Sequence, residues 1–98
     1  MAYRIRIRPE ARADLLDAFQ WYQAQREGLG HDFKLCIDEV MSKLCKHPNI
    51  YPAVHHQIRR AFIRRFPFGI FYLVENETVV VLAVLHARRD PENWKARI

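Results

Sequence analysis

Cysteine, glycine and long apolar runs are all scarce in this chain of 98 residues. Because it has two cysteines and no apolar stretch typical of a signal peptide at its N-terminus, it does not look like a secreted domain held together by disulfides. No run reaches the roughly 18 uncharged apolar residues that a membrane-spanning helix needs. The three glycines form no phosphate-binding loop. These absences predict a cytoplasmic protein that is not anchored in a membrane.

The composition is that of one folded domain, which we expect to span residues 1–98. Half of the residues are hydrophobic and 28% are charged, as in ordinary globular proteins. A chain of this length builds one core and not two. Cys36 and Cys45 lie nine positions apart in one predicted helix, so they point to opposite sides of it. We therefore predict two reduced, unpaired thiols.

The net charge of +5 is unevenly distributed along the chain. Residues 1–8 carry three arginines and no acid, and residues 48–74 carry four arginines and no acid. Acids exceed bases between residues 9 and 47, and the two balance after residue 74. Positive charge concentrated in two segments favours a polyanionic partner, which can be RNA, DNA or an acidic protein.

The spacing of apolar residues predicts the main elements. Tyr3, Ile5 and Ile7 alternate with arginines, which is the period of a strand with one buried face. Pro9 suits the first position of a helix, and the prolines of HPNIYPAVHH end a second helix. The predicted elements are a strand at 2–8, helices at 10–26 and 31–46, and strands at 57–65, 68–75 and 78–86.

This order predicts an α+β fold: an N-terminal strand, an α-helical hairpin and then a three-stranded antiparallel sheet. Gly28 and Gly30 provide the turn of the helical hairpin. Asp90 and Pro91 suit the start of a short C-terminal helix.

The last two strands are apolar on both faces. In FGIFYLVE, one face carries Phe71 and Leu73, and the other carries Phe68, Ile70, Tyr72 and Val74. In the last strand, seven successive apolar residues run from Val79 to Leu85. One helical hairpin covers only one face of a sheet. The second face must be covered by the C-terminal tail, by the loop around Ile50 and Tyr51, by a second copy of the chain or by another protein.

Four arginines occur within seven residues in IRRAFIRR, in the strand predicted at 57–65 and at its end. They indicate either a surface that binds the target or an edge strand protected from aggregation by charge. We interpret the arginines of residues 1–8 as a solvated strand face. The predicted target-binding residues are Arg59, Arg60, Arg64, Arg65, Arg88 and Arg89.

The end of the last strand, LHARRDP, offers a candidate for RNA cleavage. That reaction needs proton transfer and anion neutralisation but no cofactor. The alternative is a local ion pair between Arg89 and Asp90, with His86 used in packing. In this segment His86 is the candidate acid or base, and Arg88 and Arg89 are the candidates for anion neutralisation.

Neither a metal nor a cofactor is expected. His55 and His56 are adjacent in an extended segment, so they point to opposite sides, and no carboxylate or cysteine lies at ligand spacing from them or from His47.

Three stretches together resemble the RelE/ParE toxin superfamily. Its opening helix is similar to PEARADLLDAFQWYQAQ, its second helix and proline loop to LGHDFKLCIDEVMSKLCKHPNIYPAV, and its strand core to IRRAFIRRFPFGIFYLVENETVVVLAVLHARRDP. The resemblance covers nearly the whole chain. It is most specific in RRFPFGIFY and VLAVLHARRDP, which look more like the ParE branch.

The resemblance implies a toxin of a type II toxin-antitoxin pair. RelE-type members cut mRNA on the ribosome with basic residues and often a tyrosine or histidine near the C-terminus, whereas ParE-type members poison DNA gyrase. Arg59, Arg64 and Arg88 match basic positions of the family, so the resemblance makes these three and His86 the candidate catalytic residues. The tail, however, offers Trp94 and no tyrosine after Tyr72. We therefore expect a gyrase inhibitor, with a ribosome-dependent mRNA endoribonuclease or a non-toxic protein-interaction module as alternatives.

The resemblance also implies a partner. Both branches are neutralised by a cognate antitoxin that wraps the toxin, and this antitoxin would cover the second sheet face at Phe71 and Leu73. The chain would then form a toxin-antitoxin hetero-oligomer, while a second copy on the same face would give a homodimer.

Overall fold

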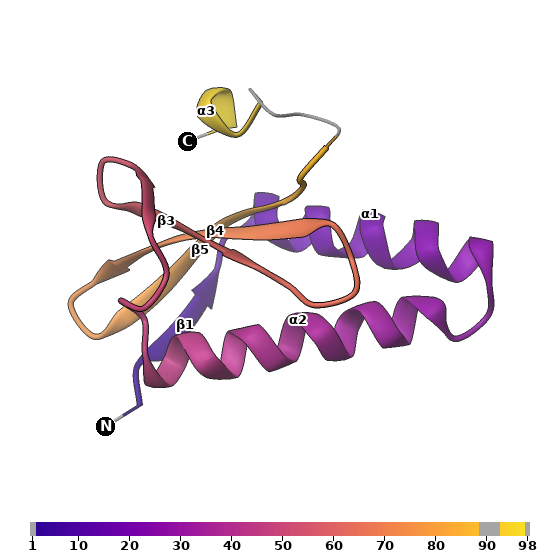
Figure 1. The fold of residues 1–98 in the computed structure, drawn as a ribbon, viewed down its shortest axis with the longest axis horizontal. Helices are drawn as coiled ribbons and strands as arrows, with labels where there is room; N and C mark the ends of the chain where they lie inside the picture. The colour runs from indigo at the N-terminus through magenta and orange to yellow at the C-terminus, as the bar shows by residue number, and fades with distance from the viewer. Residues whose placement is uncertain (1, 89–92, 98) are drawn as a thin grey trace.

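The computed structural model of the chain describes residues 2–88 and 93–97. Its fold is α+β, as predicted, with two long helices packed against a sheet (Figure 1). The elements are β1 (Arg4–Ile7), α1 (Pro9–Gln25), α2 (Leu29–Lys46), β2 (Ala53–His55), β3 (Ile58–Phe62), β4 (Phe68–Glu75), β5 (Thr78–His86) and α3 (Asn93–Arg97). The short C-terminal helix is therefore confirmed, whereas its predicted first residues, Asp90 and Pro91, lie outside the described residues.

The sheet has five strands in the order β1-β5-β4-β3-β2, and not the three that were predicted. β1 adds to the sheet by pairing in parallel with β5, from Arg4 opposite Thr78 to Ile7 opposite Val81. β2 falls in the segment that was predicted to be a loop. Because β2 has only three residues, it is too short to produce a detectable alternation, and its pairing with β3 defines it as a strand.

β3 ends at Phe62, three residues earlier than predicted. The chain turns immediately afterwards, and the N–H of Ile63 donates to the carbonyl of Phe68 at 3.1 Å. Arg65 adopts a left-handed conformation with φ 73° in this turn, and Pro67 has no N–H to continue a strand. Arg64 and Arg65 therefore lie in the β3–β4 turn and not on a strand.

The helical hairpin packs closely at Gly30. A Cβ atom at this position would lie 2.7 Å from the backbone oxygen of Phe19, so no larger residue fits without moving α1 away from α2. Gly28 precedes α2 with φ 91°, in the region that glycine adopts without strain. The two glycines thus set the turn and the separation of the helices.

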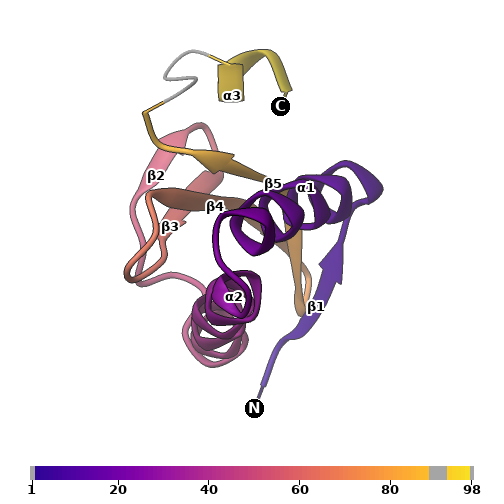
Figure 2. The ribbon, with the colours of Figure 1, turned by 90° about the vertical axis from the view of Figure 1, so that its right-hand side faces the viewer.

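The sheet carries one apolar cluster on each face. On the face covered by α1 and α2, called the first face, Tyr72 and Ile70 pack with Phe33 and Leu44 of α2. The opposite or second face has its own cluster, formed by Ile58, Phe71, Val80, Leu82 and Ala83. α2 and α3 lie on opposite sides of the sheet (Figures 1 and 2).

Both cysteines are free, as predicted: Cys36 is buried and Cys45 is partly buried. Within the part of the chain that the structure describes, no helix combines the length and the apolar character needed to cross a bilayer.

Candidate functional site

Arg59 holds the proline loop that connects α2 to β2. Its guanidinium donates hydrogen bonds to the carbonyl oxygens of Asn49, at 3.3 Å, and Tyr51. The hydroxyl of Tyr72 donates to the carbonyl of Pro48 at 2.6 Å. Burial raises the pKa of Tyr72 to about 12, although the nearby Arg59 acts in the opposite direction. Arg59 therefore has internal acceptors and stabilises the loop.

Arg64 and Arg65 both turn towards α2. Arg64 makes a bidentate ion pair with Glu39, through distances of 3.2 and 3.1 Å. The hydrogen bond from Arg64 lowers the pKa of Glu39 below its usual range. Arg65 approaches Asp32 at 3.6 Å, and Arg26 shares the same carboxylate. Both arginines remain largely exposed, so these ion pairs are weak, but their charge is already compensated.

Arg60 has a different environment on the second face. Its Cζ lies 4.6 Å from the ring centre of Phe62 and 5.9 Å from that of Phe71. Its stem packs over Gly69, where a Cβ would lie 3.1 Å from Arg60 Cγ. Among the described residues, no carboxylate forms an ion pair with Arg60. A charged guanidinium thus lies close to two aromatic rings.

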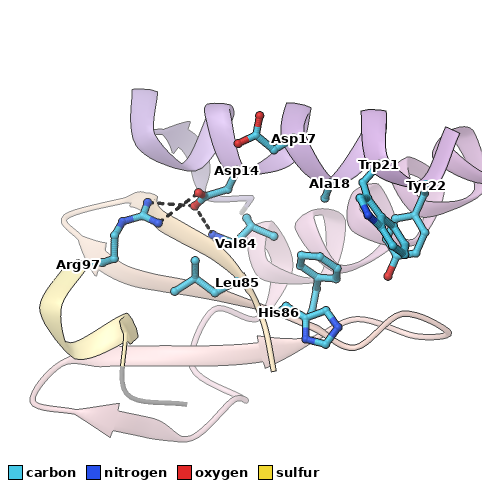
Figure 3. Close-up of a pocket in the computed structure, with 10 residues that line it drawn as sticks. Asp14, Asp17, Ala18, Trp21, Tyr22, Val84, Leu85, His86 and Arg97 are labelled. Carbon is cyan, nitrogen blue, oxygen red and sulfur yellow. Dashed lines mark hydrogen bonds and ion pairs between the residues drawn. The ribbon is translucent and has the colours of Figure 1, made fainter. Parts of the chain in front are cut away.

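His86 is the last residue of β5 and lines a cleft of about 570 Å³ between α1 and β5 (Figure 3), and Arg88 follows two positions later in the chain. The Nδ1 of His86 accepts a hydrogen bond of 3.0 Å from the backbone N–H of Arg88. The His86 ring packs edge-on against Phe68 at 5.2 Å. Trp21 and Tyr22 line the same cleft. Arg89 lies outside the described residues.

The candidate catalytic residues do not converge on one site. His86 is opposite Phe68 in the β4–β5 pairing, whereas Arg59 is opposite Tyr72 in the β3–β4 pairing. Four residues along β4 correspond to about 13 Å. Arg64 is turned away to Glu39. Of the four candidates, only His86 and Arg88 are neighbours.

Asp14 joins three elements at the other end of this cleft. Figure 3 shows Arg97 of α3 and Val84 of β5 both reaching its carboxylate. The backbone N–H of Val84 donates to Asp14 at 3.0 Å, and Arg97 donates through two nitrogens at 3.2 and 3.0 Å. β1 pairs with β5 only as far as Val81, so Asp14 provides the acceptor where β1 no longer does. Sequence reasoning missed this residue, since no local pattern marks it.

Phe71 and Leu73 both lie in the second-face cluster, but they are not equally accessible. Phe71 is only 2% exposed, because Arg60 and the cluster itself cover it. Leu73 is partly buried at the margin of the cluster. An incoming partner therefore meets Leu73 before it meets Phe71.

A second groove, of about 530 Å³, runs between α1 and α2. Its apolar lining includes Phe19, Ile37 and Met41, together with Leu16, which is 55% exposed. Sequence reasoning did not select this groove. The available signal was Leu16, a large apolar residue directly beside Leu15, because adjacent helix residues point about 100° apart.

Comparisons with known proteins agree with this architecture. The profile of the family described as "ParE toxin of type II toxin-antitoxin system, parDE" matches residues 5–91. Toxin ParE2 of two Mycobacterium tuberculosis strains is 26% identical over 99 residues, which cover 100% of this chain and 94% of the relative.

Two solved structures show the same fold. The chromosomal ParDE toxin-antitoxin system from P. aeruginosa aligns with a TM-score of 0.77 and 18% identity, over 87% of this chain and 96% of that chain. The toxin-antitoxin complex RelBE2 from M. tuberculosis aligns with a TM-score of 0.61 and 20% identity, over 88% of this chain and 99% of that chain.

Proposed function

The chain belongs to the ParE toxin family and is the toxin component of a type II toxin-antitoxin system, and we propose that it acts by binding DNA gyrase. In this proposal the toxin is a protein that binds its target and does not cut RNA. A cognate antitoxin neutralises it by covering part of its surface.

The observation that carries the proposal is the dispersal of the candidate catalytic residues. General acid/base catalysis contributes about 10² to 10⁴ in rate and needs the acid, the base and the reacting group within hydrogen-bond reach. Arg59 is bonded to the proline loop, and Arg64 is paired with Glu39. Of the other three candidates, Arg88 is the one that contacts His86. This arrangement favours binding over cleavage.

The antitoxin has two apolar surfaces available to it. The groove between α1 and α2 presents Leu16 and Met41, and the margin of the second face presents Leu73. Contiguous apolar surfaces of this kind usually mark an interaction site. We place the first antitoxin contact in the groove and a second at Leu73, whereas Phe71, which is 2% exposed, does not take part.

Expression of the chain in bacteria, with and without the neighbouring open reading frame, tests the proposal. We expect growth arrest, induction of the DNA-damage response and intact mRNA, all reversed by the antitoxin. The purified toxin should inhibit supercoiling by DNA gyrase. Cleavage of transcripts at codon-spaced positions, abolished by His86→Ala in a folded protein, would instead establish a ribosome-dependent endoribonuclease. Harmless overproduction would identify a non-toxic interaction module.

A further inference from the structure

The four arginines of IRRAFIRR have different partners, and Arg60 is the one whose side chain makes no hydrogen bond or ion pair with the described residues. Arg59 donates to backbone carbonyls, and Arg64 and Arg65 face acids of α2. Arg60 has only aromatic rings around its guanidinium. Arg60 is thus the arginine of this run that an outside anion can bind without displacing a hydrogen bond or an ion pair of the described residues.

The position of Arg60 is fixed before any partner arrives. The guanidinium lies within 6 Å of the ring centres of both Phe62 and Phe71, and the absence of a side chain at Gly69 leaves room for its stem. The planar guanidinium stacks on aromatic faces and presents its N–H groups in a rigid fork that matches a carboxylate. A side chain that is already ordered loses less entropy on binding. Arg60 is therefore preorganised as an anion receptor.

The surroundings of Arg60 indicate which anion it receives. Ile58 and Phe62 lie on the same face of β3, and Phe62 is 51% exposed. Binding to a nucleic-acid backbone depends on several cations that follow its phosphates. Here Arg59, Arg64 and Arg65 have internal partners, and the arginines of β1 lie at the opposite edge of the sheet. A single arginine beside an exposed aromatic residue is instead typical of the energetic centre of a protein–protein interface.

We propose that Arg60, positioned by Phe62, Phe71 and Gly69, binds a carboxylate on the protein that this toxin inhibits. The inference rests on the proposed function, because it takes the target to be a protein. Arg60 makes the charged contact, and Phe62 makes the adjoining apolar contact. Gly69 acts only by leaving space for the Arg60 stem.

Four variants separate these roles. Arg60→Gln removes the charge, Arg60→Lys keeps the charge but loses the planar fork, and Gly69→Ala crowds the stem without touching the charge. Arg64→Gln is the matched control, since it removes a paired arginine from the adjoining turn. Thermal unfolding of each variant establishes that it is folded before binding is compared.

Binding to purified DNA gyrase and inhibition of supercoiling are the first measurements. We expect Arg60→Gln to reduce both gyrase affinity and inhibitory potency at least 10-fold. Arg60→Lys and Gly69→Ala should reduce them less, and Arg64→Gln should stay within about twofold of the wild type. Affinity for the antitoxin should be unchanged in Arg60→Gln. Equal gyrase binding by folded Arg60→Gln overturns the inference, as does a parallel loss of antitoxin binding.

Two further measurements separate this inference from the proposed function. If the wild type does not bind gyrase, the gyrase proposal fails, and growth arrest becomes the readout. Arrest by the wild type but not by folded Arg60→Gln then supports Arg60 as the contact to another protein, whereas equal arrest overturns it. Labelled DNA and RNA oligonucleotides are the last probe, and binding that depends on Arg60 would replace the carboxylate with a phosphate and overturn the inference.

Discussion

Asp14 and Val84 are 70 positions apart in the chain, yet the Asp14 carboxylate accepts the backbone N–H of Val84 at 3.0 Å. The same carboxylate binds Arg97, so one side chain of α1 contacts both the C-terminal half of β5 and α3. This contact connects the helical layer to the part of the sheet from which the C-terminal segment leaves.

Replacing Asp14 with Ala should lower the free energy of unfolding by about 1–3 kcal/mol, because the Val84 N–H loses its acceptor and Arg97 loses its partner. Asp17→Ala is the matched control, since Asp17 lines the same cleft on the same helix and should change stability little. Urea denaturation of both variants provides the measurement. If Asp14→Ala were as stable as Asp17→Ala, water would replace the Asp14 carboxylate at no cost in the free energy of unfolding.

Tyr72 should give the unfolding free energy a component that depends on alkaline pH. Its pKa is raised to about 12 in the folded protein, above a value of about 10 in the unfolded chain. A raised folded-state pKa stabilises fully below the unfolded pKa, and this stability is lost as the pH rises from about 10 to about 12. Stability measured across this range should fall in the wild type, and this component should be absent in Tyr72→Phe.

The same Tyr72→Phe variant should be less stable at neutral pH by about 1–3 kcal/mol, because the carbonyl of Pro48 loses its buried donor. Tyr51→Phe is the control, since Tyr51 receives the Arg59 bond through its backbone. If Tyr72→Phe were as stable as the wild type at neutral pH, the proline loop would not depend on this hydrogen bond.

Gly30→Ala should destabilise the helical hairpin by about 1–3 kcal/mol, because the added methyl group overlaps the backbone oxygen of Phe19 at 2.7 Å. Alanine normally stabilises a helix relative to glycine, so the sign of the effect is informative. Chemical denaturation measures it. A stabilised Gly30→Ala protein would show that α1 and α2 separate without cost.

Leu16→Asp should weaken antitoxin binding by at least 10-fold without unfolding the toxin, because Leu16 is exposed in the apolar groove between α1 and α2. Leu35→Asp is the matched control: Leu35 is 67% exposed on α2 and does not line that groove. Titration calorimetry with the purified antitoxin provides the comparison. Unchanged affinity in Leu16→Asp would remove the groove from the antitoxin interface.

The sequence by itself determined the elements whose signals are local. The helical hairpin followed from Pro9, the two glycines near residue 29 and the spacing of apolar residues, and the structure confirms it. β4 and β5 followed from their continuous apolar runs, and their apolar character on both faces appears as two separate clusters. These properties depend on residues that lie a few positions apart in the chain, so they can be predicted directly from the order of residues.

Tertiary structure alone decided how the strands pair and what each arginine does. β1 and β5 pair although more than 70 positions separate Arg4 from Thr78, and β2 is a strand only because β3 lies beside it. Arg59 and Arg60 are adjacent and look equivalent in the sequence, yet one binds the proline loop and the other lies close to two aromatic rings on the opposite face. Successive side chains of a strand point to opposite faces, so the register with distant segments selects their partners. That register is a property of the folded sheet, which is why no local pattern could predict the roles of these arginines.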